Sequence, residues 1–178
     1  MSKTSWMKID QEHESSNLQE LLIDEMRDIY HAENQLVKAL PKMVKAAHDP
    51  ELKKSFEEHL QKTEGHVSRL QKAFEILGEK PRSKVCKGMM GLVQEGSEHI
   101  QEGKDIEELE ADLSLIASAQ KVEHYEISGY GTLRTFAEKL GQNELADLLQ
   151  QIENEEKEAD QTLSQASMRL LEQSGDGC

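Results

Sequence analysis

Acidic side chains occupy positions in this chain where a helical pattern calls for apolar ones. Glu33 lies four residues after Ile29, which places it about 40° away on a helical wheel and inside the apolar stripe. Glu123 is in line with Ile116 and Ile127 in the same way. An isolated carboxylate on an inner helix face takes up a proton, and a cluster of them repels, unless cations compensate the charge. The pattern therefore predicts a buried acidic site that binds cations.

Two further segments place polar residues on their inner faces. His59 and His66 flank Thr63, each within about 60° of it on the wheel, whereas Glu64 points away from that face. Later in the chain, Glu126 flanks the stripe of Glu123, and a run of acids surrounds the line from Ile152 to Ala159. The inward-facing candidates are Glu33, His59, His66, Glu123, Glu126, Glu155, Glu156 and Asp160.

The spacing of these residues from the turns predicts that they meet. Glu33 stands about as far before a turn near residue 48 as Thr63 stands after it, so equal rise makes Glu33 level with Thr63 and His66. The same counting around Gly141 makes Glu123 level with about Asp160, and Glu126 level with about Glu156 or Lys157.

A shared depth for carboxylates and imidazole suits two metal ions. Carboxylate oxygens and imidazole nitrogens ligate iron or manganese, and facing helices of a bundle are a known scaffold for dimetal sites. We predict two metal ions, iron first and manganese as the alternative. The predicted ligands are Glu33, His66, Glu123, Glu126, Glu156 and Asp160, with Glu155 and His59 in reserve.

Simpler interpretations of single residues stay open. Glu155 and Asp160 lie at stripe edges, from which a carboxylate reaches solvent at little cost. His59 and His66 could be core histidines with hydrogen-bond partners. Three tyrosines could donate to the site or simply pack at helix interfaces: Tyr30, Tyr125 and Tyr130.

The elements that must position these residues are helical. The chain has 3 prolines and 4% aromatic residues, and its apolar residues recur at helical spacing between breakers. Pro41 should kink the first helix. The expected helices cover residues 17–47, a second from the cap at Asp49 to Leu77, a short one over 89–100, a third long one from the cap at Asp105 to Leu140, and a last one opened by Asn143.

Two antiparallel hairpins joined by a long connection predict an all-α, ferritin-like four-helix bundle with one long crossover that contains a short extra helix. We expect the bundle to occupy residues 17–173, between a disordered N-terminal tail over 1–16 and a disordered C-terminal tail over 174–178.

Charge and composition narrow the partners. A formal net charge of −14 opposes binding to nucleic acids and to anionic membranes. The sequence has no apolar run of the length of a membrane span and no signal-peptide pattern near its start, which favours a cytoplasmic protein. Cys86 and Cys178 have no metal-motif spacing, so we expect free thiols, with Cys178 exposed.

Four segments carry a family resemblance: Asp28–Gln35, His59–His66, Val122–Tyr130 and Glu155–Asp160. Together they resemble the YciE/YciF family of bacterial ferritin-like stress proteins. The resemblance covers about residues 18–167. It implies a ferritin-like bundle that forms homodimers, an association with bacterial stress responses, and a dimetal centre without an established reaction.

One departure from the wider ferritin and rubrerythrin pattern bears on the site. Those proteins carry Glu-x-x-His on two helices, whereas this sequence has no Glu-x-x-His and places Thr63 three residues before His66. Such a site could bind metal more loosely, bind one ion, or bind none. The leading hypothesis is a stress-response protein that oxidises ferrous iron or removes peroxide. The alternatives are a non-enzymatic dimeric bundle with a metal-free remnant of the site and, ranked lower, a storage cage.

Overall fold

The computed structural model describes the backbone of residues 3–175 and the side chains of residues 16–174. All regular structure in this part of the chain is helical. The elements are α1 (Lys3–Ala46), α2 (Pro50–Ile76), α3 (Lys87–Glu102), the 3₁₀ turn η1 (Gly103–Asp105), α4 (Glu108–Lys139) and α5 (Asn143–Gly175).

The boundaries of α2 follow from local chemistry. Asp49 has extended backbone, and its carboxylate accepts the backbone N–H of Leu52, while Pro50 occupies the first turn, where its missing N–H costs nothing. The helix ends before Gly78, whose φ of 69° lies in the left-handed region that favours glycine. Gly141, with φ 70°, ends the α4 region in the same way.

Three boundaries differ from the sequence prediction: the starts of α1 and α4 and the end of α5. Asp105 does not cap α4, because it lies in η1, and α4 begins at Glu108 after Glu107 as N-cap. The backbone of α1 begins at Lys3 rather than near residue 17 and continues through Pro41. At the other end, α5 continues to Gly175, and residues 176–178, with the predicted end of the tail and Cys178, lie outside the described residues.

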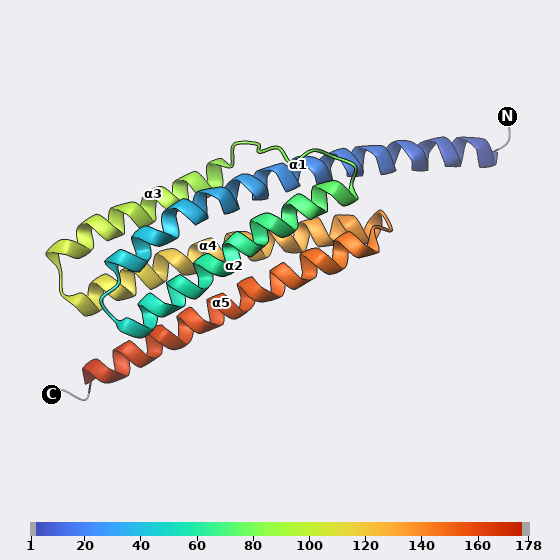
Figure 1. Ribbon diagram of the computed structural model, residues 1–178. Coiled ribbons are helices and arrows are strands. Elements are labelled where there is room, and N and C mark those ends of the chain that lie inside the picture. Colours follow the sequence, from blue (N-terminus) through green and yellow to red (C-terminus); the bar gives the residue numbers. More distant parts are fainter. Residues whose placement is uncertain (1–2, 176–178) are drawn as a thin grey trace.

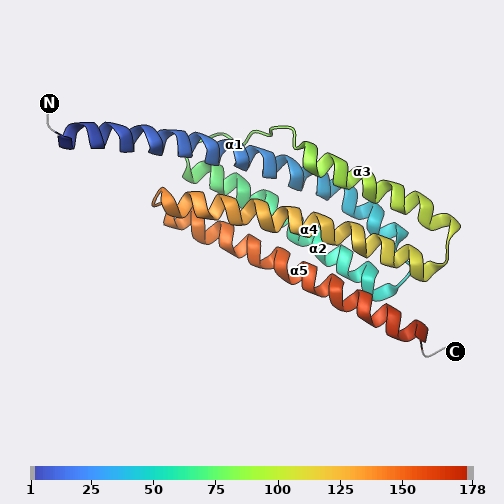
Figure 2. The same cartoon turned by 180° about the vertical axis from the view of Figure 1, so that it is seen from behind.

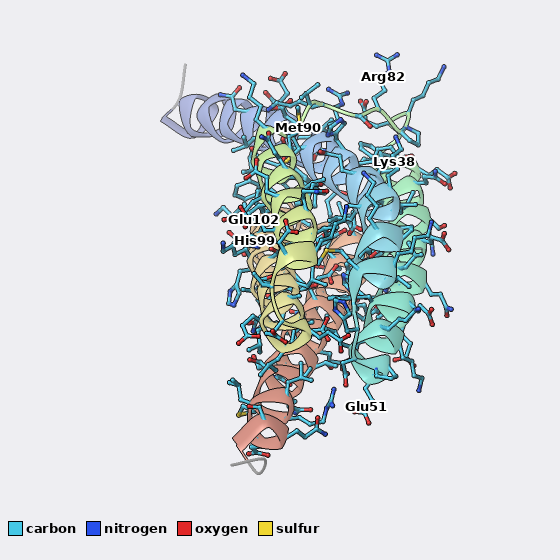
Figure 3. All side chains as sticks on the ribbon, turned by 90° about the vertical axis from the view of Figure 1, so that its left-hand side faces the viewer. Lys38, Glu51, Arg82, Met90, His99 and Glu102 are labelled. Carbon is cyan, nitrogen blue, oxygen red and sulfur yellow. The ribbon has the colours of Figure 1, made fainter. Side chains whose placement is uncertain are left out.

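The four long helices form two antiparallel hairpins, α1–α2 and α4–α5, which pack side by side (Figures 1 and 2). α1 lies beside α4, and α2 lies beside α5. Between the hairpins, residues 77–86 run back along the bundle, and α3 then returns the chain to the end that holds the α1–α2 turn. Seen from that end, α3 stands on the outside against α1 and α4 (Figure 3). The predicted bundle with one crossover and a short extra helix is confirmed.

The crossover is fixed to α1 by polar contacts. Lys84 donates its backbone N–H to the carbonyl of Arg27 and its ammonium to Asp24, at 3.0 and 2.6 Å. Cys86 is a free thiol, as predicted, and the structure buries it, where its sulfur caps α3 by accepting the N–H of Met89. These contacts set the position from which α3 covers the seam between the two hairpins.

None of the described helices is long and apolar enough to cross a membrane. The interior instead holds two apolar clusters, one around Met26, Phe74 and Leu149 and the other around Phe56 and Leu163. The buried acids lie on the same helices.

Candidate metal centre

A first cluster of potential ligands joins both hairpins, and we call it the Glu33 group. It consists of Glu33 on α1, His66 on α2 and Glu156 on α5, whose ligand atoms lie within 4.8 Å of one another. His66 Nδ1 is 2.8 Å from Glu156 Oε1 and 3.3 Å from Glu33 Oε1. All three side chains are buried. The prediction that Glu33 lies level with His66 is confirmed.

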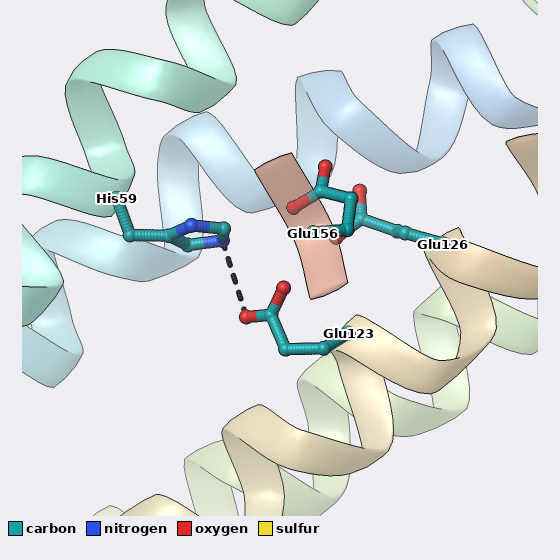
Figure 4. A group of neighbouring side chains, drawn as sticks. All are labelled: His59, Glu123, Glu126 and Glu156. Carbon is teal, nitrogen blue, oxygen red and sulfur yellow. Dashed lines mark ion pairs between the residues drawn. The ribbon is translucent and has the colours of Figure 1, made fainter. Parts of the chain in front are cut away.

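The second cluster, the Glu123 group, shares Glu156 with the first. It consists of His59 on α2, Glu123 and Glu126 on α4, and Glu156, again with ligand atoms within 4.8 Å (Figure 4). His59 Nε2 is 3.2 Å from Glu123 Oε1. Every member is buried, and Glu126 and Glu156 are fully enclosed. A carboxylate has two oxygen atoms, so one that belongs to both ligand clusters is able to contact two metal ions.

Most polar atoms of both groups make no hydrogen bond within the chain, and the imidazole–carboxylate distances given above are the main contacts between them. Both carboxylate oxygens of Glu126 and of Glu156 are buried without a hydrogen bond. The same holds for both ring nitrogens of His59, for His66 Nδ1 and for one oxygen each of Glu33 and Glu123. A buried polar atom without a partner costs about 1–3 kcal/mol, and more when it is charged. Buried carboxylate oxygens and imidazole nitrogens that lack hydrogen bonds are suitable ligands for iron, manganese or a similar cation.

The acid–base properties of the residues indicate the same deficit of positive charge. Burial, and then repulsion from neighbouring carboxylates, raises the pKa values of Glu123 and Glu126 well above the ordinary 4.5. Burial also raises the pKa of Glu33, although His66 opposes this shift. Burial alone would lower the pKa of His66, but contacts with Glu156 and Glu33 raise it to about 10. Without metal, the groups therefore hold extra protons in place of cations.

His66 is held from its outer side by residues that do not join either group. Its Nε2 donates to Glu155 Oε2 at 3.0 Å, which leaves Nδ1 facing Glu33 and Glu156. The carboxylate of Glu155 in turn accepts two hydrogen bonds from Arg69, at 2.9 and 2.5 Å. A carboxylate on the second nitrogen fixes the tautomer and ring orientation of a ligating histidine. Sequence analysis missed Arg69, although its place three residues after His66 puts both on one side of α2.

Other candidate residues have separate partners. Asp160 belongs to neither group, because its carboxylate accepts a hydrogen bond from Gln120 and lies 3.5 Å from His124 Nε2, near the surface of α4 and α5. His59, a reserve ligand in the prediction, belongs to the Glu123 group, and Asp160 does not. Thr63 donates to the carbonyl of His59 and contributes no ligand.

The three tyrosines differ in their roles. Tyr130 is buried, and its hydroxyl donates to Glu33 Oε1 in the Glu33 group. Tyr125 instead donates to Asp28 at 2.6 Å and contacts Cys86 Sγ, while Tyr30 packs edge-on against Phe74. Of the three tyrosines, Tyr130 is therefore the one that contacts a candidate ligand group.

Comparison with known proteins agrees with this architecture. A family described as a domain of unknown function, DUF892, matches residues 17–174. Protein YciF from Escherichia coli (strain K12) is 40% identical over 144 residues, which is 80% of this chain and 86% of YciF.

Solved structures extend the likeness to three dimensions. The crystal structure of the E. coli stress protein YciF has a TM-score of 0.83 at 36% identity and covers 87% of this chain and 97% of its own. YcfI from Rhodopseudomonas palustris has a TM-score of 0.78 at 39% identity and covers 83% of this chain and 92% of its own. The fold, the matched family and the extent of identity together establish that this chain belongs to the YciE/YciF family, within DUF892.

Proposed function

We propose that this chain is a ferritin-like stress-response protein whose interior holds two metal ions, with iron preferred and manganese as the alternative. The observation that carries the proposal is the shared Glu156, which belongs to both buried ligand groups. The first ion is held by Glu33, His66 and Glu156, and the second by His59, Glu123, Glu126 and Glu156. A stress role is supported by the likeness to the E. coli stress protein YciF.

The proposed activity is oxidation of ferrous iron or removal of peroxide. A bound pair of iron ions would supply reversible one-electron chemistry at each ion. The protein's own contribution is to orient His66 through Glu155 and to hold Glu33 through the Tyr130 hydroxyl. Burial keeps bulk water away from the carboxylates, which strengthens their attraction for cations.

Metal analysis of purified and reconstituted protein tests the proposal first. We expect about two iron or manganese ions per chain, anomalous-scattering peaks at both ligand groups, and ferrous oxidation that Glu33→Ala and Glu123→Ala each abolish. Glu153→Gln is the control, because Glu153 of α5 is also a buried glutamate but pairs with Arg134 and Lys157 rather than with either ligand group. Absence of metal after reconstitution, with unchanged behaviour in both variants, overturns the proposal.

One observation favours a metal-free alternative, a dimeric bundle with an interaction role. A protonated His66 contacts both Glu33 and Glu156 and so compensates part of their charge without metal. The same metal analysis decides between the two functions, because only the metal-free bundle stays empty in excess iron.

We further propose a cytoplasmic homodimer, on the family resemblance and on the buried free thiol of Cys86. Sedimentation analysis tests the assembly. A dimer in solution excludes a storage cage, whereas a large shell would overturn the proposed dimer.

A further inference from the structure

A small cavity leads toward the Glu123 group from one side of the bundle. It lies between α1, α3 and α4, has a volume of about 40 Å³, and ends at His59 and Glu123. Both of these side chains are buried ligand candidates, so the cavity touches the proposed centre directly. Its outer edge includes the exposed Lys42 and Ser97.

The walls of the cavity are mainly apolar. Among the polar groups that line it, Ser118 is engaged elsewhere, since its hydroxyl lies 2.6 Å from His99 Nδ1 and 3.2 Å from the carbonyl of Ser114. The other polar groups lie at the two ends. The apolar walls include Leu36, Leu40, Met43, Leu92, Val93 and Val122.

The crossover helix creates this cavity. Leu92 and Val93 of α3 form its outer wall, and Gly96 is buried against α4, where an added Cβ would meet Ser118 Cβ at 3.8 Å. Without α3, the apolar surface between α1 and α4 would be open to water. The helix that lies outside the four-helix bundle therefore keeps this approach dry.

Size and polarity together select the occupant. Organic ligands occupy pockets of about 300–1,000 Å³, and a water needs about 10–15 Å³ together with two to four polar partners. A cavity of about 40 Å³ with apolar walls is too small for an organic ligand and offers water few partners along its length. Apolar cavities of this kind take up neutral, apolar species such as xenon.

We propose that this cavity binds dioxygen and delivers it to the Glu123 group. The delivery role rests on the proposed function, whereas the binding of an apolar gas depends only on the cavity. Dioxygen is a small, neutral and apolar oxidant, which matches the apolar walls. His59 and Glu123 close the inner end of the cavity.

A second cavity provides the contrast. It has a volume of about 60 Å³, lies between α2, α4 and α5, and reaches the same His59 and Glu123. Its walls carry Ser55, Glu58, Lys62 and Thr162, so this approach suits water and polar solutes. Because the two cavities reach the Glu123 group from different sides, a substitution in one cavity should affect an apolar molecule and a substitution in the other a polar molecule.

Two matched substitutions separate the approaches. Ala39 lines only the first of these cavities and Ala159 only the second, and both are half-buried helical alanines. Leucine keeps helix propensity at either position and fills the adjacent space. Circular dichroism and thermal unfolding verify that Ala39→Leu and Ala159→Leu are folded, and Val93→Ala serves as a variant that enlarges the first cavity.

The first measurement uses metal-free protein. Under xenon pressure, ¹²⁹Xe exchange and methyl shifts of Met43 and Val122 should report a bound gas, and dissolved dioxygen should broaden the same methyl signals. We expect Ala39→Leu to lose these effects, Ala159→Leu to keep them, and Val93→Ala to strengthen them. No gas effect in the wild type, or loss only in Ala159→Leu, overturns the proposal.

The second measurement uses protein loaded with ferrous iron. We expect Ala39→Leu to slow the second-order reaction with dioxygen at least fivefold at unchanged iron content, while the reaction with hydrogen peroxide stays within twofold. Equal dioxygen rates in Ala39→Leu and the wild type overturn delivery through this cavity. Failure of the metal centre is seen separately, as absence of iron from the wild type whatever the gas result.

Discussion

Arg69 contacts neither ligand group, yet it holds the carboxylate that orients His66. We expect Arg69→Ala to lower metal affinity about 10- to 100-fold, the usual effect of losing such an outer contact. Titration with Co²⁺, followed by its visible spectrum, measures the change. Arg134→Ala is the control, because Arg134 also pairs with a glutamate of α5, Glu153, and is similarly exposed. Equal affinity losses in both variants would contradict a specific role for Arg69.

The raised pKa values of the buried acids predict how the metal-free protein responds to pH. Glu123 and Glu126 bind protons more tightly in the folded than in the unfolded chain, so their contribution to stability is complete below pH 4.5 and is lost as pH rises through their folded pKa values. His66 acts in the same direction between 6.5 and about 10. The lowered pKa of Glu156 acts oppositely, below 4.5. We therefore expect the free energy of unfolding to fall from pH 6 to pH 9.

Chemical denaturation at several pH values measures this slope. Glu126→Gln should flatten it, because the amide cannot ionise, whereas Glu153→Gln should not, because the pKa of Glu153 is already lowered by Lys157 and Arg134. Bound metal should also flatten the slope. A metal-free wild type whose stability rises over this range would contradict the assignment.

At the residue scale, the sequence predicted which helix faces carry the acids but not which neighbours each acid meets. Glu33, His66, Glu123, Glu126 and Glu156 could be predicted because helical period and equal rise from a turn fix face and depth. The choice of His59 over Asp160, and the support from Arg69, depend on side-chain rotamers and helix rotation. Neither is encoded in the spacing of one helix.

Among the elements, the α1–α2 turn contacts α4 through one buried acid that belongs to neither ligand group. Asp112 accepts the backbone N–H groups of His48 and Asp49, at 2.9 and 2.7 Å. We expect Asp112→Ala to cost about 2–4 kcal/mol in the free energy of unfolding, because two donors lose a charged acceptor. Urea denaturation measures the loss. Asp105→Ala, on exposed η1, should stay within about 0.5 kcal/mol.

The elements themselves were largely predictable because breakers and caps act locally. Pro50 and Gly78 delimit α2 as expected, and α3 contains the predicted residues 89–100. The N-cap of α4 was placed two residues early, at Asp105 rather than Glu107, since Asp105 resembles a cap but belongs to η1. The contact of Asp112 with the distant turn was missed, because nothing in the local sequence of α4 specifies a partner more than 60 residues away.

For the whole molecule, both ligand groups draw on both hairpins, α1–α2 and α4–α5. A bound ion would therefore connect the two halves of the bundle. We expect a single bound ion, at 100 times its dissociation constant, to raise the free energy of unfolding by about 2.7 kcal/mol. Hydrogen exchange should slow in both hairpins together. Protection confined to one hairpin would indicate that the ion binds elsewhere.

The position of Glu156 in both groups has a consequence for how the centre fills. Two ions that share one carboxylate are not independent, so occupancy at the Glu33 group must alter affinity at the Glu123 group, and thermodynamic reciprocity requires the same factor in the other direction. Glu33→Ala would isolate the second affinity, Glu123→Ala the first, and the wild type would show their coupling. A half-filled protein is then a distinct chemical species, whose abundance is set by that one shared side chain.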